Sequence, residues 1–396
     1  MSSTHYNVYG VERSYFTRKM TCTFNAMGLQ YQLKKGRAHY MDAAKAGYPG
    51  GIPFVKTMNN EYAWDTTRVA EHLEYIHGND KNFSSLLPTD SVSLFLNYLI
   101  EDMSDEWLYR CATGTRWYFP ENTTFASHDL ALDSSVGIYA NGMGIPTWRM
   151  AANIADRVRT SCPPGGFNET TRDSFVSEVL WPWMELLSTH FKTYPFLFGN
   201  RPSLADVAIF GGAAAHFAQD PLCRRWCDEK GPYLVAHTHR LLENGAEFNE
   251  RNLQERQWKS YDWDPTTNMS NSMMAILTDA GRLYLPWVSK ACVDGEAVLE
   301  FKSGIKVNIK PTPFLMESRQ IMLARYEKLK SPKLNLILKK AGILKYFEGF
   351  KIEKQLEDIS IVPQPYHNRG FPTPNAVDEK TGRADNYSQM RELGKL

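Results

Sequence analysis

The sequence predicts a mixed α/β domain over residues 1–80, an all-helical domain over residues 91–262 and a further extension over residues 263–362. In the first part, short β-prone runs alternate with apolar residues at helical spacing. From about residue 91 to about residue 296, the pattern is helical and contains no convincing strand. The length of 396 residues fits two or three domains.

The first domain opens with a strand at Tyr6–Tyr9 and a helix whose apolar residues recur at spacings of four, four and three, namely Phe16, Met20, Phe24 and Met27. Gly28 is expected to end this helix, and Leu29–Leu33 to form a second strand. A hairpin is predicted over Phe54–Trp64, with Asn59 and Asn60 in its turn. Asp65 then provides an N-cap for a further helix.

In the helical domain, Ser203 and Asp206 have the spacing of a capping box, and the apolar residues 207–215 after them predict a buried central helix. In the extension, alternating residues on either side of Ser303 and Gly304 predict a hairpin. Ser331 and Pro332 are expected to restart a helix. Residues 363–396 are rich in proline and mixed charge, which predicts an irregular tail.

The composition is that of an ordinary globular protein, with 43% hydrophobic and 22% charged residues. The 45 Lys and Arg residues balance 44 Asp and Glu residues, so a nucleic acid partner is not expected. There is no membrane-spanning run and no signal-peptide pattern, which favours a cytoplasmic location. The six scattered cysteines are expected to be reduced thiols.

Taken together, these elements resemble the glutathione transferase superfamily over roughly residues 5–245. The run Tyr9–Phe16 is similar to the serine and cysteine types of that family, and the run Glu101–Trp117 is similar to a bacterial subgroup. The resemblance implies a thioredoxin-like domain of order β-α-β-α-β-β-α that binds glutathione, followed by the helical domain. It also implies a homodimer, with an interface blocked or replaced by the extension as the alternative.

The resemblance places a catalytic hydroxyl at Ser14, at the start of the first helix. Both a hydroxyl donor and a helix N-terminus favour the thiolate form of glutathione, whose thiol otherwise has a pKa of about 8.5. By resemblance, Ile52 and Pro53 share a cis peptide bond beside the cysteinyl part of glutathione, while Asp65 and Thr66 bind its γ-glutamyl end. The alternatives are a simple helix cap at Ser14 and a plain helix start at Asp65.

Two positions depart from the family pattern, because Tyr15 replaces the usual proline and Gly51 replaces a polar clamp for glutathione. Binding would then rely on other basic groups, for which the candidates are Arg13, Arg18 and Lys56. Tyr9, at the end of the first strand, is an alternative hydroxyl donor.

Four acidic residues, Glu101, Asp102, Asp105 and Glu106, fall on neighbouring faces of one predicted helix. They form either a solvated or ion-paired face, with Arg110 and Arg116 as partners, or an acidic cluster facing a substrate. Aromatic residues for a second-substrate pocket are expected at Tyr15, Trp107 and Trp117, with core packing as the alternative.

No metal is expected, because the spacing of Cys223, Cys227, His237 and His239 is loose for a zinc site. The basic run Lys328–Lys345 predicts an amphipathic surface helix, or else a docking site for acidic partners or lipid. Motifs of nucleotide hydrolases, zincins and α/β-hydrolases are absent from the sequence.

The function that these observations predict is a transferase that activates the thiol of its co-substrate glutathione for attack on a small hydrophobic or aromatic electrophile, as in detoxification. Two alternatives remain open: a non-catalytic scaffold that keeps the fold for protein interaction, and a glutathione-dependent reductase or ether-cleaving enzyme.

Overall fold

The computed structural model describes residues 6–35, 52–56, 62–80, 83–135, 147–161, 165–243, 261 and 269–350. Its first sheet contains β1 (Tyr6–Tyr9), β2 (Tyr31–Lys34), β3 (Phe54–Lys56) and β4 (Tyr62–Trp64) in the order β2-β1-β3-β4. β1 is parallel to β2 and antiparallel to β3, and β3 is antiparallel to β4. The predicted hairpin is confirmed, although Asn59 and Asn60 lie outside the described residues.

Within the described part of this domain, two helices accompany the sheet, α1 (Tyr15–Met27) and α3 (Thr66–His77). The predicted first helix is confirmed, and it ends at Gly28 in the left-handed conformation, with φ of 75°. Leu29 was expected to begin the second strand, but its main-chain N–H donates to the carbonyl of Phe24 at 2.9 Å. Leu29 therefore completes the C-cap of α1, and β2 begins later. The helix expected between the second and third strands falls on residues outside the described ranges.

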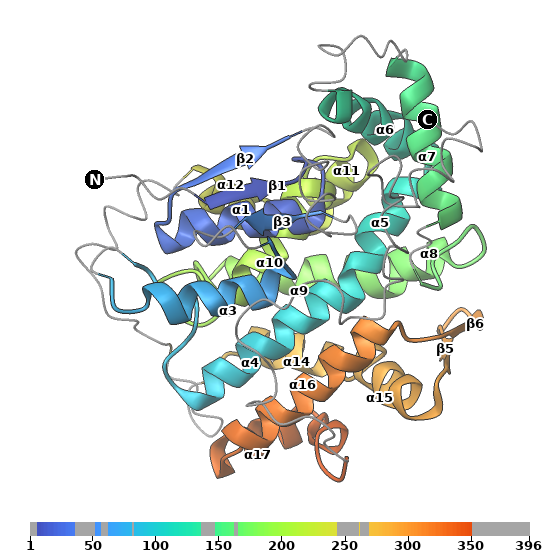
Figure 1. The fold of residues 1–396 in the computed structure, drawn as a ribbon. Helices are drawn as coiled ribbons and strands as arrows, with labels where there is room; N and C mark the ends of the chain where they lie inside the picture. Colours follow the sequence, from blue (N-terminus) through green and yellow to red (C-terminus); the bar gives the residue numbers. More distant parts are fainter. Residues whose placement is uncertain are drawn as a thin grey trace, which may run out of the picture.

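The second domain is built of helices, as predicted, with three π-helical segments among them (Figure 1). In chain order its elements are α4 (Ser91–Asp102), η1 (Met103–Leu108), α5 (Tyr109–Tyr118), α6 (Pro120–Ser135), α7 (Thr147–Ser161), α8 (Arg172–Phe175), η3 (Val176–Leu180), α9 (Trp181–Phe191), α10 (Leu204–Gly212), η4 (Ala213–Phe217), α11 (Pro221–Lys230) and α12 (Pro232–Glu243).

The predicted central helix is confirmed as α10, in which every residue is buried. Its capping box is also confirmed: the Ser203 side chain accepts from the main-chain N–H of Asp206, and the Asp206 carboxylate accepts from that of Ser203. α10 packs against both α1 and α4. At Gly211, an added Cβ would lie 2.9 Å from the main-chain oxygen of Tyr15, so the close approach of α1 to α10 requires glycine there.

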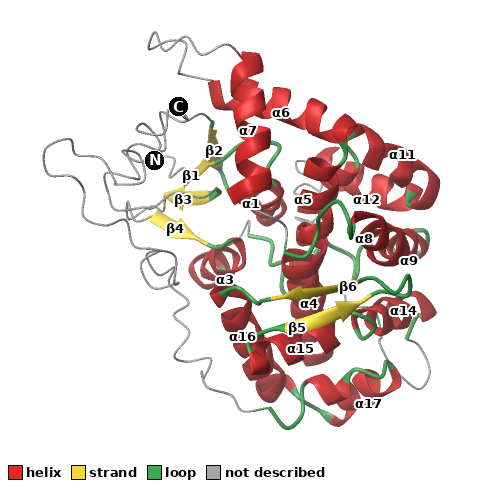
Figure 2. Ribbon diagram, turned by 90° about the vertical axis from the view of Figure 1, so that its right-hand side faces the viewer, coloured by secondary structure: helices red, strands yellow, loops and turns green. Residues whose placement is uncertain are grey.

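The extension comprises α14 (Asn271–Ala280), α15 (Tyr284–Asp294), β5 (Ala297–Glu300), β6 (Lys306–Ile309), α16 (Pro313–Leu329), α17 (Pro332–Lys340) and the 3₁₀ turn η5 (Leu344–Tyr346). The predicted hairpin is confirmed, with β5 antiparallel to β6 (Figure 2). The predicted restart of the helix is also confirmed, because Ser331 caps α17. α17 buries the apolar residues Leu334, Ile337 and Leu338, as an amphipathic helix does. The predicted tail, residues 363–396, lies outside the described residues.

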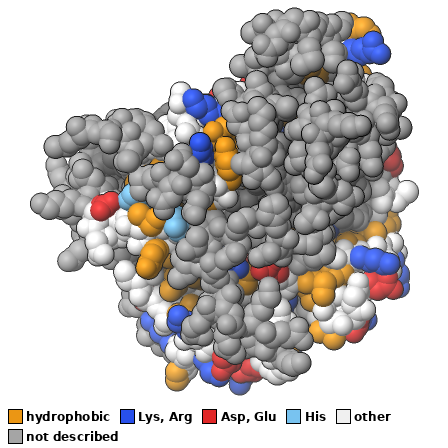
Figure 3. Space-filling model, viewed as in Figure 1, with side chains coloured by type: hydrophobic (Ala, Val, Ile, Leu, Met, Phe, Trp, Pro, Cys, Tyr) orange, Lys and Arg blue, Asp and Glu red, His pale blue; other side chains and the backbone are white. Residues whose placement is uncertain are grey.

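The extension packs on the helical domain, with α16 against α4. Trp107 of η1 contacts Tyr284 and Trp287 of α15 at ring-centroid distances of 5.9 and 5.6 Å, so the two units share an aromatic core. Among the described helices, none is long and apolar enough to cross a membrane. On the face seen in Figure 3, the described basic, acidic and apolar side chains are interspersed rather than gathered by type.

Candidate functional site

The strand register brings three of the predicted site segments to one edge of the sheet. Tyr9, at the end of β1, pairs with Phe54, the first residue of β3, and Phe54 pairs with Trp64, the last residue of β4. The segment after β1 leads to Ser14, the segment before β3 is Ile52–Pro53, and the residues after β4 are Asp65 and Thr66. All three segments therefore extend from the same end of these paired strands.

Ser14 is the N-cap of α1, in extended backbone conformation, and its Oγ accepts from the main-chain N–H of Thr17 at 3.3 Å. The side chain is half-buried. Ser14 thus lies at the positive end of the helix dipole, where an anion is stabilised. The simple helix cap, which is the alternative to a catalytic role at Ser14, is therefore present.

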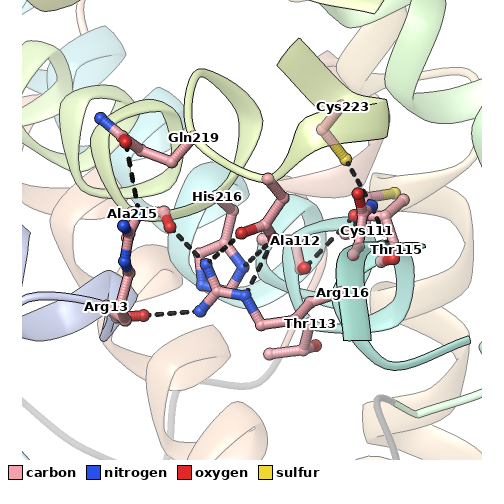
Figure 4. A network of polar contacts seen from close by, with 12 residues as sticks. Arg13, Cys111, Ala112, Thr113, Thr115, Arg116, Ala215, His216, Gln219 and Cys223 are labelled. Carbon is pink, nitrogen blue, oxygen red and sulfur yellow. Dashed lines mark hydrogen bonds and ion pairs between the residues drawn. The ribbon is translucent and has the colours of Figure 1, made fainter. Parts of the chain in front are cut away.

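A buried ion pair of the helical domain binds the residue before Ser14 (Figure 4). Arg116 donates from Nη1 to the main-chain oxygen of Arg13 at 2.6 Å and from Nε and Nη2 to the two oxygens of Asp220, both at 2.9 Å. It also donates to the main-chain oxygen of Ala215. The expectation that Arg116 pairs with the acidic residues of 101–106 is therefore wrong, because Asp220 and main-chain oxygens take its hydrogen bonds.

The other two segments have the geometry that the resemblance predicts for their backbone. The Ile52–Pro53 bond is cis. Asp65 caps α3: its Oδ1 accepts from the main-chain N–H groups of Thr67 at 2.9 Å and Arg68 at 3.3 Å. Asp65 has a φ of 76°, a left-handed conformation that is costly for a residue other than glycine. Thr66, the first residue of α3, is buried.

This combination of sheet order, cis bond and helical second domain agrees with the fold that the resemblance predicts. The fold is similar to that of the glutathione transferases. The first domain has the thioredoxin-like topology that the resemblance predicts, as far as the described residues extend.

No family model and no curated protein matches this chain. Among solved structures, a beta-etherase from Sphingobium sp. strain SYK-6 is 19% identical, with coverage of 64% of this chain and 99% of that one and a TM-score of 0.44. A rice glutathione transferase in complex with glutathione is 13% identical, with coverages of 64% and 96% and a TM-score of 0.38.

A glutathione transferase from Methylobacterium radiotolerans in complex with glutathione sulfonate is also similar. It is 15% identical, the match covers 63% of this chain and 95% of that one, and the TM-score is 0.37.

Beside the predicted site lies a buried ion cluster whose lysine the sequence did not predict. Lys19, on α1, is fully buried, and its Nζ lies 2.5 Å from Oε1 of Glu101 and 2.5 Å from Oδ2 of Asp105. The same Nζ donates to the hydroxyl of Thr67 on α3 at 3.1 Å. The cluster therefore joins the first domain to α4 and η1.

The acidic residues of α4 and η1 are thus partly ion-paired, which is one of the two expected alternatives. Burial raises the pKa of Asp105 to about 8, although Lys19 acts in the opposite direction. Burial also raises the pKa of Asp102 and, together with Asp102 and Asp105, holds the pKa of Glu106 well above its ordinary value. Arg110, the other expected partner, donates to the main-chain oxygens of Glu106 and Gly165.

The three residues expected to line a second-substrate pocket pack in the interior. Tyr15 is 2% exposed, and its hydroxyl donates to the main-chain oxygen of Ser104 at 3.0 Å. Trp107 is buried in the aromatic core that it shares with α15, and Trp117 is also buried. These positions correspond to the alternative of core packing.

The remaining candidates for glutathione binding have partners within the chain. Arg18 donates to the main-chain oxygen of Glu12 at 2.9 Å, and Lys56 lies over the ring of Tyr62. Arg13 forms an ion pair with Asp129. Tyr9 is buried with its ring stacked on that of Phe54. Gly51 lies outside the described residues.

The cysteines and histidines that are candidate zinc ligands make other contacts. Cys223 and Cys227 are buried, and the described part of the chain contains no group of three or more His, Cys, Asp or Glu residues that could hold a metal ion. His237 lies 3.0 Å from Oδ1 of Asp206 and stacks on Phe191. Burial lowers the pKa of His237, which favours the neutral imidazole.

Proposed function

We propose that the protein binds glutathione at the sheet edge formed by Ser14, Ile52–Pro53 and Asp65–Thr66, and activates its thiol for attack on a small hydrophobic or aromatic electrophile. The observation that carries this proposal is the strand register, because it gathers the three segments at one end of β1, β3 and β4. We include in the proposal a cytoplasmic detoxification role and a homodimer as the working unit.

Ser14 would stabilise the thiolate. A serine hydroxyl has one donor hydrogen and two acceptor lone pairs. The Oγ of Ser14 accepts from Thr17, so the cap leaves the hydroxyl hydrogen available to donate to a sulfur anion. Capping and catalysis are therefore compatible at this residue, and each pKa unit by which the thiol is lowered corresponds to about 1.36 kcal/mol.

The start of α3 would bind the γ-glutamyl end of glutathione. A carboxylate is stabilised at a helix N-terminus by main-chain N–H groups and the helix dipole. Thr66 would add a hydroxyl, and the carboxylate of Asp65 would attract the ammonium group. The main chain beside the cis Ile52–Pro53 bond would pair with the cysteinyl part, as an added strand does.

A kinetic comparison of Ser14→Ala with Ser270→Ala tests this proposal. Ser270 caps α14 through the same type of bond, from the N–H of Met273, so each variant loses one helix cap, worth about 1 kcal/mol. We expect only Ser14→Ala to lower kcat/KM for glutathione conjugation and to move its pH profile to higher pH, because less thiolate forms at neutral pH. The electrophile panel includes aryl halides and aryl ethers.

The result that would contradict the proposal is conjugation by Ser14→Ala with the rate and pH profile of the wild type. Equal losses in the two variants would also contradict it, because they would show that Ser14 acts only as a cap.

A further inference from the structure

A small pocket lies where α3, α4, η1 and α16 meet. Its volume is about 30 Å³, which is room for one or two groups of the size of water. The helix α16 belongs to the extension, so both domains and the extension contribute to the wall. Six acidic residues line the pocket: Asp65, Glu101, Asp102, Asp105, Glu106 and Glu317.

Within the described residues, the cations in and beside the pocket are fewer than these acids. Lys19 is shared between Glu101 and Asp105, so one ammonium group contacts two carboxyl groups. Of the two arginines in the pocket wall, Arg325 forms its ion pair with Glu71, which is not a lining residue. The other, Arg68, is 3.9 Å from Glu317, which is a long ion pair.

Asp102 receives its hydrogen bonds from neutral groups. The hydroxyls of Tyr284 and Ser318 each donate to its carboxylate at 2.5 Å. These bonds satisfy the oxygens of Asp102 but bring no positive charge to the pocket. The acids on α4 and η1 therefore exceed the cations that contact them.

Two carboxylates in the wall also have unused acceptor capacity. Asp105 is 9% exposed, and its Oδ1 has no hydrogen-bond partner within the described ranges. The described hydrogen bonds include none to the carboxylate of Glu106, which is half-buried, and the nearby Arg110 donates to the main-chain oxygens of Glu106 and Gly165. An unpaired buried acceptor is costly and is normally satisfied by water or a ligand.

We propose that this pocket binds a primary ammonium group, with Asp105 and Glu106 as its acceptors. An ammonium group is compact and carries three hydrogen-bond donors and one positive charge, which match the size, the free oxygens and the charge of the pocket. The ammonium belongs either to a free amine or to glutathione.

Calorimetric titration with 1,4-diaminobutane tests this pocket, with 1,4-butanediol as the uncharged control. The titration is run on the full chain without glutathione, so its outcome does not depend on the proposed transferase activity. We expect heat of binding with the diamine and none with the diol. A repeat with saturating glutathione identifies the source of the ammonium: competition assigns the pocket to glutathione, and independent binding assigns it to a second molecule.

Glu106→Gln keeps the shape of the side chain but cannot ionise opposite an ammonium group, so we expect it to weaken diamine binding by about tenfold or more. Glu300→Gln is the matched control, because Glu300 pairs with Lys306 on the exposed hairpin and should leave binding unchanged. Glu317→Gln provides a second pocket variant if Glu106→Gln fails to fold. Equal heats with diamine and diol, or wild-type diamine binding in the pocket variants, would overturn the proposal.

Discussion

Replacing Lys19 with methionine tests the ion cluster that joins the first domain to α4 and η1. The substitution keeps a long side chain of similar volume but removes the only charge among the described residues that contacts both Glu101 and Asp105. These two residues are 3% and 9% exposed, so water does not readily replace the lost ammonium. Removal of one partner from a buried ion pair costs about 3–5 kcal/mol of the free energy of unfolding, and we expect a loss in this range at pH 8.

The pH dependence of this loss has a definite sign. The folded-state pKa of Asp105 is raised to about 8, so between about pH 4 and pH 8 the folded protein binds this proton more readily than the unfolded chain. The free energy of unfolding attributable to Asp105 therefore falls as pH rises through that window. Without Lys19 the pKa of Asp105 rises further and the fall continues to higher pH, so the difference between wild type and Lys19→Met should be larger at pH 8 than at pH 5.

Urea unfolding followed by tryptophan fluorescence, at both pH values, measures this difference. Lys306→Met is the control, because its pair with Glu300 is exposed and should contribute less than about 1 kcal/mol. Adding Glu101→Gln and Asp105→Asn to Lys19→Met should recover most of the loss, since the uncompensated charges disappear. A loss in Lys19→Met no larger than that of the control, or equal losses at both pH values, would refute the reasoning.

Three further predictions concern the interior. Asp206→Ala should lower the free energy of unfolding by about 3 kcal/mol or more, because the main-chain N–H groups of Leu197 and Ser203 lose their buried acceptor. Urea unfolding measures this loss, and a loss below about 1 kcal/mol would contradict the prediction. Gly114→Ala should lower the free energy of unfolding by about 1–3 kcal/mol in the same assay, because a Cβ there would lie 2.2 Å from the ring of Phe167. Gly231→Ala is the control and should lower it less, because the atom nearest to its added Cβ is 3.4 Å away. In a Cys162→Ser background, a thiol reagent near pH 7 should react far more slowly with the native protein than with the urea-unfolded protein. The reason is that burial raises the pKa of each remaining cysteine, to about 11 for Cys292. Equal rates of reaction would refute this prediction.

Local signals in the sequence were sufficient for much of the fold. The end of α1 at Gly28, the cap at Asp65 and the capping box at Ser203 depend on residues within a few positions of each other, so the sequence predicts them directly. The hairpin around Gly304 is of the same kind. By contrast, the three π-helical segments leave no periodic signal, because each departs from the helical repeat for a single short stretch.

Contacts between distant parts of the chain could not be predicted in the same way. Lys19 follows Tyr15 by one helical turn, and nothing in that spacing shows that its carboxylate partners lie more than eighty residues away. Arg116 was assigned to nearby acids, but its partner Asp220 is 104 residues distant. For Trp107, the sequence allowed a pocket or a core, and the packing of α15 against it decides for the core.

The most direct test of the account is a titration of glutathione into the purified protein, with thiolate absorbance followed in the same samples. The comparison is between wild type and Ser14→Ala. We predict that the wild type binds glutathione in the micromolar to millimolar range and that the thiolate signal falls in Ser14→Ala. Absence of glutathione binding at several millimolar, or an undiminished thiolate signal in Ser14→Ala, would contradict the proposed function.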